Sequence, residues 1–309
     1  MTGDERQRLI RLKPNLQRRA LIHDSIRAFF RAEDFLEVET PVRVPCVAPE
    51  PYINTFRSEG WFLATSPELH MKRLLAAGYP KLFQFSRCLR RGERGRWHNP
   101  EFTMLEWYRA GAGYAEIILD TEKLLVALAD RLGLGHIIPY RGRKIDISPP
   151  WPRITVAEAF RAAAGWDPVT AYDPDRFETD FLDKVLPGLT PDRPAVLTGY
   201  PAALASLARL DPGNPLVAER AEVFIGGLEL ANAYSELRDS REQEARFQDA
   251  IDQIQREQPP APPMPRTFLA ALAHLPECGG IALGIDRLAM LLCDADSIDE
   301  VMAFTTDTA

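Results

Sequence analysis

The sequence predicts an α+β fold in which a mostly antiparallel sheet is flanked by helices. Residues 83–108 give the first sign, because two runs of alternating apolar residues flank a short loop rich in Gly and Arg, as in a β-hairpin. The expected strands and helices do not alternate regularly along the chain, which favours this class over a doubly wound parallel sheet. No internal repeat or clear linker divides the sequence, so residues 1–309 are expected to form a single domain.

The first expected elements are a helix and a strand. Apolar residues recur at helical spacing in residues 15–33 and predict an amphipathic helix. A strand is expected from Phe35 to Thr40, because Pro41 cannot donate a ladder hydrogen bond and stops it. The hairpin follows, with its first strand ending at Arg90.

The second strand of the hairpin starts at Phe102. Side chains alternate along a strand, so four of them share one face: Phe102, Met104, Glu106 and Tyr108. With the arginine that ends the first strand, this hairpin offers a guanidinium, a flat aromatic ring and a carboxylate to one cavity. That combination suits a nucleoside triphosphate beside a small cationic substrate.

After the hairpin the pattern is mostly helical. The expected elements are helices at 115–132 and 241–256, a short strand at 195–198 and a stiff Pro-rich surface loop at 259–265. Thr155 and Glu158 have the capping-box spacing that opens one more helix. The remainder of the Pro-rich stretch 165–215 gives no clear pattern.

The composition is ordinary for a soluble globular protein, with 46% hydrophobic and 26% charged residues. No apolar run approaches the roughly 18 residues that cross a bilayer, and the N-terminus lacks the apolar core of a signal peptide. We therefore expect a cytoplasmic protein with no membrane partner. The four cysteines show no C-x-x-C spacing, which favours buried thiols over a zinc site or a redox pair.

The charge distribution is uneven. The net charge of −7 at pH 7 is a poor match to a polyanion such as tRNA. A local cluster is nevertheless strongly positive: Arg87, Arg90, Arg91, Arg94 and Arg96. A positive cleft on an acidic protein suits a small anion such as ATP, or an acidic protein partner.

Five segments resemble motifs of the class II aminoacyl-tRNA synthetases, in the lysyl branch. In chain order they match motif 1, the amino-acid loop, motif 2, the segment with metal and lysine ligands, and motif 3: residues 29–41, 65–75, 83–108, 222–237 and 279–292. Each segment alone is a weak signal, but their order and spacing make a strong one. The resemblance implies the catalytic core of these enzymes as the fold, ATP and Mg²⁺ as cofactors, and a homodimer with isologous contacts through motif 1.

The resemblance also implies that the carboxylate of an amino acid attacks the α-phosphorus of ATP. Because an anion attacks an anion, the site must neutralise charge and hold an in-line geometry. Arg90 matches the catalytic motif 2 arginine that contacts the α-phosphate and the carboxylate, and Arg287 matches the motif 3 arginine that contacts the γ-phosphate. A planar guanidinium stays charged and binds oxyanions through two hydrogen bonds. Outside these motifs, both arginines would be interpreted as surface ion-pair residues.

By the same resemblance, Phe102 stacks on adenine, and His98 and Asn99 lie in a loop that closes over the nucleotide; alone, Phe102 would be interpreted as a core strand residue. The other positions that match ATP contacts are Arg91, Gly92, Glu93, Glu229, Leu230 and Gly284. Many class II enzymes carry glutamate at the position of Gly92, where it contacts the adenine amino group. Either Glu93 replaces it here after a small loop shift, or backbone groups of the loop suffice.

Glu222 and Glu229 match the carboxylates that hold Mg²⁺ against the phosphates in the family, and they flank Gly226 and Gly227. Hard oxygen ligands that share phosphate coordination are what Mg²⁺ prefers. Their spacing alone would equally fit two solvated residues at strand ends.

The amino-acid pocket should be acidic, because a desolvated ammonium needs a carboxylate partner. The positions that match substrate contacts are Ser66, Pro67, Glu68, Glu106, Tyr108, Asn232, Glu236 and Ala282. Glu236 is expected to take the distal amine of the substrate, with Glu68 and Glu106 nearer the proximal one. Glu68 has a second explanation, because Thr65 and Glu68 have the spacing of a helix capping box with Pro67 in the first turn. The two roles can coexist.

Two departures from lysyl-tRNA synthetases indicate a narrower family. The segment that matches motif 1 ends at residue 41, so the N-terminal β-barrel that binds the anticodon is expected to be absent. Ala282 replaces a glycine of motif 3, and a methyl group on the pocket floor could favour the shifted amine of β-lysine over α-lysine by ~1–3 kcal/mol. Both features resemble the truncated lysyl-synthetase relatives that join (R)-β-lysine to a lysine side chain of elongation factor P.

Three functions are open at the level of sequence. The first is activation of (R)-β-lysine as an adenylate and its transfer to elongation factor P, and the second is activation of α-lysine for tRNA or another acceptor. The third is an inactive regulatory paralogue that binds a ligand or a partner. The acidic net charge disfavours tRNA as a partner, and the retention of Arg90, Arg287, Glu222 and Glu229 disfavours the inactive paralogue.

Overall fold

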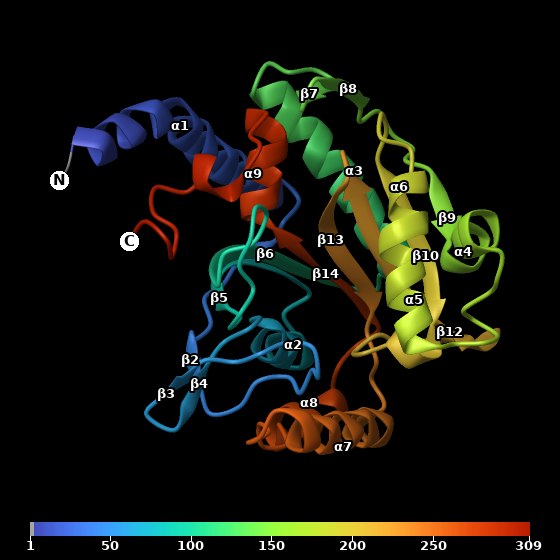
Figure 1. The fold of residues 1–309 in the computed structure, drawn as a ribbon. Coiled ribbons are helices and arrows are strands. Elements are labelled where there is room, and N and C mark those ends of the chain that lie inside the picture. Colours follow the sequence, from blue (N-terminus) through green and yellow to red (C-terminus); the bar gives the residue numbers. More distant parts are fainter. Residues whose placement is uncertain (1–2) are drawn as a thin grey trace.

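A long mixed sheet forms the centre of the molecule in the computed structural model, which describes residues 3–309 (Figure 1). Over these residues the sheet has nine strands in the order β1-β5-β6-β14-β13-β12-β10-β9, with β11 beside β12. The strands are β1 (Leu36–Glu37), β5 (Lys81–Leu89), β6 (Glu101–Ala110), β9 (Arg153–Thr155), β10 (Ala195–Pro201), β11 (Leu210–Asp211), β12 (Asn214–Ile225), β13 (Leu228–Ser235) and β14 (Cys278–Gly284). Apart from β1 with β5 and β9 with β10, the neighbouring strands pair antiparallel, so the predicted α+β class is confirmed.

Helices cover both faces of this sheet. They are α1 (Gly3–Ala32), α2 (Glu68–Ala76), α3 (Tyr114–Arg131), α4 (Val156–Ala164), α5 (Pro174–Asp180), α6 (Leu186–Gly188), α7 (Ser240–Glu257), α8 (Arg266–Leu272) and α9 (Ile285–Cys293), with short turns η1 (Phe181–Val185), η2 (Ala202–Leu204) and η3 (Ile298–Glu300). Two small sheets lie outside the centre, formed by β2 (Arg43–Val44), β3 (Arg57–Ser58) and β4 (Trp61–Leu63), and by β7 (Ile137–Tyr140) and β8 (Arg143–Asp146). No helix of the described part of the chain is long and apolar enough to cross a membrane.

The predicted hairpin is formed by β5 and β6, which pair in register from Lys81 opposite Arg109 to Leu89 opposite Glu101. Alternation along these strands separates two faces of the sheet. Apolar side chains such as Leu105 and Trp107 pack into the main core with α1, α3 and α9, which Figure 1 shows above the sheet. The side chains of Glu106 and Tyr108 on β6 therefore point to the opposite face, on the side of α2, α7 and α8.

The N-terminal helix is longer than its sequence pattern predicts. The expected helix at 15–33 is the second part of α1, which begins at Gly3 and keeps Pro14 in its interior. The first part lies against the C-terminal segment, where Arg8 Nη2 donates to the carbonyl oxygen of Ala303 at 3.0 Å. Tertiary contact thus overrides the tendency of proline to start or break a helix.

The strand expected from Phe35 to Thr40 was predicted too long. Only Leu36–Glu37 pairs with β5, and the amide of Val38 makes one more hydrogen bond, to the carbonyl oxygen of Phe83 at 2.9 Å. β1 is an edge strand, so its length depends on how far it can follow a single neighbour rather than on its own pattern.

The other expected elements are confirmed. α3 and α7 match the helices at 115–132 and 241–256, β10 contains the strand at 195–198, and the loop at 259–265 joins α7 to α8. The capping box of α4 is formed, because Thr155 Oγ1 accepts from the amide of Glu158 at 3.1 Å and Glu158 Oε2 accepts from the amide of Thr155 at 2.9 Å. The stretch without a clear pattern contains α5, η1 and α6, which pack on α4 and β10 through aromatic rings of a separate apolar cluster.

Candidate active site

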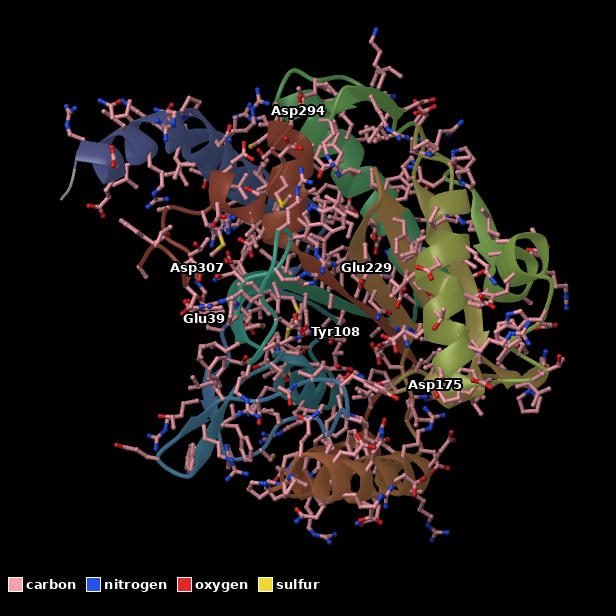
Figure 2. The ribbon with its side chains drawn as sticks, in the orientation of Figure 1. Glu39, Tyr108, Asp175, Glu229, Asp294 and Asp307 are labelled. Carbon is pink, nitrogen blue, oxygen red and sulfur yellow. The ribbon has the colours of Figure 1, made fainter. Side chains whose placement is uncertain are left out.

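A cavity of about 1020 Å³ lies on the polar face of the sheet. Most predicted site residues line it: Ser66, Glu68, Arg90, Glu93, His98, Asn99, Phe102, Glu106, Tyr108, Glu229, Leu230, Asn232, Glu236, Ala282, Gly284 and Arg287. Figure 2 shows two of them, Tyr108 on β6 and Glu229 on β13, near the middle of the molecule. The volume is at the upper end of the range for small-molecule sites, ~300–1,000 Å³.

Four predicted residues lie beside the cavity rather than in its wall. Pro67 separates two lining residues, and Arg91 and Gly92 form the exposed turn that follows β5. Glu222 is buried behind Asn232, its partner on the next strand.

Strand register explains why distant residues meet in the cavity. One row of neighbours crosses β6, β14, β13 and β12: Glu106, Ala282, Asn232 and Glu222. Two residues further along, a second row contains Tyr108, Gly280, Tyr234 and Arg220. Ala282 therefore lies in the cavity wall between Glu106 and Asn232.

Glu106 marks one end of the cavity and is almost completely buried. Ser66 Oγ donates to Glu106 Oε1 at 2.6 Å, and the Tyr108 hydroxyl donates to Oε2 at 2.8 Å. Burial, with the nearby carboxylate of Glu68, raises the pKa of Glu106 to about 8 against these two hydrogen bonds. An incoming ammonium would favour the ionised form of this carboxylate.

Lys72, on α2, is a buried residue at the same end that the sequence analysis did not identify. Its Nζ donates to Glu68 Oε1 at 2.5 Å and pairs with Glu236 Oε2. Burial opposes its charge, but Glu236 and then Glu68 outweigh burial and raise the pKa of Lys72. Glu236 Oε1 has no hydrogen-bond partner within residues 3–309, so it is free to accept from a substrate amine. The spacing of four residues from Glu68 on a predicted helix was the available signal.

The capping-box explanation for Glu68 is wrong. Pro67 is the N-cap residue of α2, and the side chain of Thr65 makes no cap hydrogen bond. Ser66 Oγ accepts from the amide of Glu68 at 3.0 Å instead, which leaves the carboxylate of Glu68 directed to Lys72. Glu68 therefore belongs to the charged network of the cavity.

The opposite end of the cavity is basic and aromatic. The guanidinium of Arg90 lies 5.3 Å from the ring centroid of Phe102, and its Nη1 is 3.6 Å from Glu93 Oε1. Gly92 has a φ of +87°, a backbone conformation that residues with a side chain rarely adopt, so a glutamate at this position would be strained. Glu93 lines the cavity, which supports the alternative that it replaces the missing glutamate.

Arg287 lies beside Arg90's end of the cavity, at the start of α9. Its Nη1 donates to the carbonyl oxygen of Glu229 at 2.7 Å, and its Nη2 donates to His98 Nε2 at 2.5 Å. Burial and then Arg287 lower the pKa of His98, so the imidazole is neutral and can accept this hydrogen bond. Gly284 is the N-cap of α9 and no side chain caps that helix, which leaves backbone amides for an anion.

Asn99 is already used by the protein. Its Nδ2 donates to the carbonyl oxygen of Glu101 at 2.6 Å, and its Oδ1 accepts from the amide of Thr306 at 3.0 Å. Although Asn99 lines the cavity, its amide group fixes the loop after β5 against the C-terminal segment.

The predicted metal ligands differ in exposure. The side chain of Glu229 is 45% exposed, whereas that of Glu222 is 9% exposed and accepts from Tyr200 at 2.6 Å and from Arg220 at 2.5 Å. Burial, and to a lesser degree the charge of Glu229, raise the pKa of Glu222. In residues 3–309 no three His, Cys, Asp or Glu side chains are arranged to hold a metal by themselves.

The donor atoms at this place nevertheless suit Mg²⁺. Asn232 Nδ2 lies 3.4 Å from Glu222 Oε1, while Asn232 Oδ1 is buried without a hydrogen-bond partner in the described chain. Two carboxylates and an unpartnered carbonyl oxygen are hard ligands, and Mg²⁺ usually completes its shell with substrate phosphates and water.

The whole chain matches a known family. Residues 6–308 match the family model described as tRNA synthetases class II (D, K and N), so the chain belongs to the class II tRNA synthetase family. Within the family it is similar to elongation factor P–(R)-β-lysine ligases. It is 39% identical over 313 residues to that of Klebsiella pneumoniae, an alignment that covers 96% of both chains. It is 37% identical over 306 residues to that of Vibrio parahaemolyticus and 38% identical over 314 residues to that of Sodalis glossinidius, which cover 94% and 96% of both chains respectively.

Proposed function

We propose that this protein uses ATP to activate (R)-β-lysine as an aminoacyl adenylate and transfers the β-lysyl group to a lysine side chain of elongation factor P. The match to ligases of this name along almost the entire chain carries the proposal. The cavity supports it, because it combines an acidic end for a diamino acid with a basic end for a triphosphate.

In the first step a carboxylate oxygen of β-lysine attacks the α-phosphorus, the bond to the bridging oxygen breaks, and pyrophosphate leaves. Arg90 lies at the basic end beside Phe102, and its Nε donates to the carbonyl oxygen of Thr65, the neighbour of Ser66, so it would neutralise both the attacking carboxylate and the α-phosphate. Arg287 and the amides at the start of α9 would hold the outgoing phosphates. These groups are held by the protein before the substrates bind, so little reorganisation accompanies the reaction.

In the second step the amine of an acceptor lysine attacks the acyl carbonyl. An amide bond forms, AMP leaves, and the amine loses a proton. Class II enzymes of this family use ATP with Mg²⁺, and here Glu229 and Glu222 would bind the ion, which supplies positive charge to the phosphates.

Ala282 is proposed to select β-lysine over α-lysine. Its methyl group extends from the cavity floor between Glu106 and Asn232. Moving the proximal amine from the α-carbon to the β-carbon changes where the substrate meets this floor, an effect that one methyl group limits to ~1–3 kcal/mol.

We extend the proposal to assembly and location. The outer side of α1 carries a shallow, mainly apolar surface that suits contact with a second copy of the chain. It is lined by Leu9, Ile10, Leu16 and Ala20 together with Arg6, Lys13 and Gln17. Residues 1–309 would act as one catalytic domain in a homodimer, and a substrate that serves translation would place the enzyme in the cytoplasm.

The proposal is tested by incubating the protein with ATP, Mg²⁺, (R)-β-lysine and purified elongation factor P. Intact-mass spectrometry should then show one added β-lysyl group on the factor, with none when ATP is omitted or when Arg90→Ala is used. The variant Arg87→Ala is a matched control, because Arg87 is exposed on β5, three residues before Arg90, and lies outside the cavity wall. An adenylate that forms without modification of the factor would contradict the proposed acceptor.

A further inference from the structure

The carboxylates expected to bind the substrate amines already have protein partners. Glu68 and Glu236 share Lys72, although Glu236 keeps Oε1 for the distal amine, and Glu106 accepts from Ser66 and Tyr108. With the Glu68 carboxylate satisfied by Lys72, the amine nearest the reacting carboxyl group needs a further acceptor.

Glu50 is available for this role. It lies on the loop between β2 and β3, is partly buried, and lines the cavity. Within residues 3–309 no side chain or backbone group is hydrogen-bonded to its carboxylate or forms an ion pair with it. A partly buried acidic side chain in a ligand cavity, with no partner among the described residues, is suited to a cationic ligand.

The neighbours of Glu50 define which cation it would meet. Arg90 and Glu68 line the same cavity as Glu50 and act on its carboxylate, Arg90 by favouring the charged form and Glu68 by opposing it. Arg90 is the residue proposed above to hold the reacting carboxylate, and Glu68 belongs to the acidic end. Glu50 therefore lies near the place where the carboxyl group of the substrate meets its first amine.

We infer that Glu50 binds the proximal ammonium of the substrate, so that binding depends on the position of that amine. This inference rests on the proposed function, since it assigns one contact within the proposed substrate site. Burial raises the pKa of Glu50 to about 7, with Arg90 opposing the shift, so an ammonium at this place would also draw the carboxylate into its ionised form. A carboxylate beside the proximal amine would act together with Ala282, which lies on the floor of the same part of the cavity.

The test removes the carboxylate charge and, separately, the amine. Glu50→Gln is compared with the wild type in ATP–pyrophosphate exchange with (R)-β-lysine, and 6-aminohexanoate, which lacks the proximal amine, is measured as a competitive inhibitor of that exchange. Glu59→Gln is the matched control, because it makes the same change at an exposed glutamate outside the cavity wall. The KM for ATP is recorded for each protein.

Glu50→Gln should raise the KM for β-lysine about 10- to 100-fold, the range expected for losing a hydrogen bond to a charged group. The inhibition constant of 6-aminohexanoate and the KM for ATP should change less than about three-fold, and Glu59→Gln should behave as the wild type. Equal losses for β-lysine and 6-aminohexanoate, or an unchanged KM for β-lysine, would overturn the inference alone. A wild-type protein without exchange would overturn the proposed function and the inference with it.

Discussion

Of the two glycines that line the cavity in the described chain, Gly280 has less room for a side chain than Gly284. A Cβ added there would lie 2.2 Å from two ring atoms of Tyr108 and 2.6 Å from Glu236 Oε1. Both neighbours are buried and bound within the acidic end, so neither can move easily.

Gly280→Ala should therefore raise the KM for β-lysine and lower the free energy of unfolding by about 1–3 kcal/mol. Urea unfolding and pyrophosphate exchange measure the two effects. Gly188→Ala is the control, because a Cβ at Gly188 meets nothing within 4 Å. Unchanged stability and an unchanged KM in Gly280→Ala would contradict the tight packing of Tyr108 and Glu236 against Gly280.

Glu106 predicts a specific dependence of stability on pH. Its pKa of about 8 in the folded protein exceeds its ordinary value of 4.5, mainly because of burial. The folded state then holds the proton more tightly, so the stabilisation is complete below about pH 4.5 and is lost as the pH rises through 8. Glutamine cannot lose a proton at this position.

The free energy of unfolding of Glu106→Gln, relative to the wild type, should therefore rise by more than ~1 kcal/mol between pH 5 and pH 9. Urea unfolding across this range measures the difference. Glu101→Gln, an exposed residue on the same strand, should give a difference that stays nearly constant. A constant difference for Glu106→Gln as well would contradict the raised pKa.

At the residue scale, most of the residues chosen by motif resemblance line the cavity, but motif resemblance missed side chains whose role depends on tertiary neighbours. Lys72 was missed although its spacing from Glu68 was visible, because a lysine on a helix is usually solvated. Glu50 lies on a loop without secondary structure, so no periodicity indicates where its side chain points. The positive φ of Gly92 likewise belongs to the backbone of the turn and has no signal in the sequence pattern.

At the scale of elements, the capping box of α4 should stabilise the protein locally. Thr155 Oγ1 and the side chain of Glu158 satisfy amides at the start of the helix. Thr155→Ala should lower the free energy of unfolding by about 1 kcal/mol without changing the KM for β-lysine, since α4 lies outside the cavity wall. Thr306→Ala, at an exposed position without a cap, serves as the control in urea unfolding. A loss of the same size in both variants would contradict the cap.

Local signals explain which elements could be predicted. The hairpin, α3, α4 and α7 follow from alternation, helical spacing and a cap, all of which act within a few residues. The start of α1 and the length of β1 could not be predicted, because contacts with the C-terminal segment and with β5 decide them. The rows that bring Glu106, Ala282 and Asn232 together depend on register between strands far apart in sequence, which motif order does not specify.

At the scale of the whole molecule, the outer side of α1 predicts self-association. Ile10 is 49% exposed within the apolar surface of this helix. Ile10→Glu would place a charge in a contact repeated on both copies, so it should weaken the dimer and shift sedimentation towards the monomer. Leu119→Glu makes the same change at a 45% exposed leucine of α3 and should leave the sedimentation coefficient unchanged. A wild-type protein that sediments as a monomer would contradict the proposed assembly.

The central claim is that this cavity activates β-lysine. Amino-acid-dependent ATP–pyrophosphate exchange, comparing (R)-β-lysine with α-lysine, tests that claim most directly. We predict a higher kcat/KM for (R)-β-lysine, and a preference that Ala282→Gly reduces by a factor of about 10 or more, in keeping with the effect of one methyl group. A higher kcat/KM for α-lysine, or no exchange with either amino acid, would contradict the account.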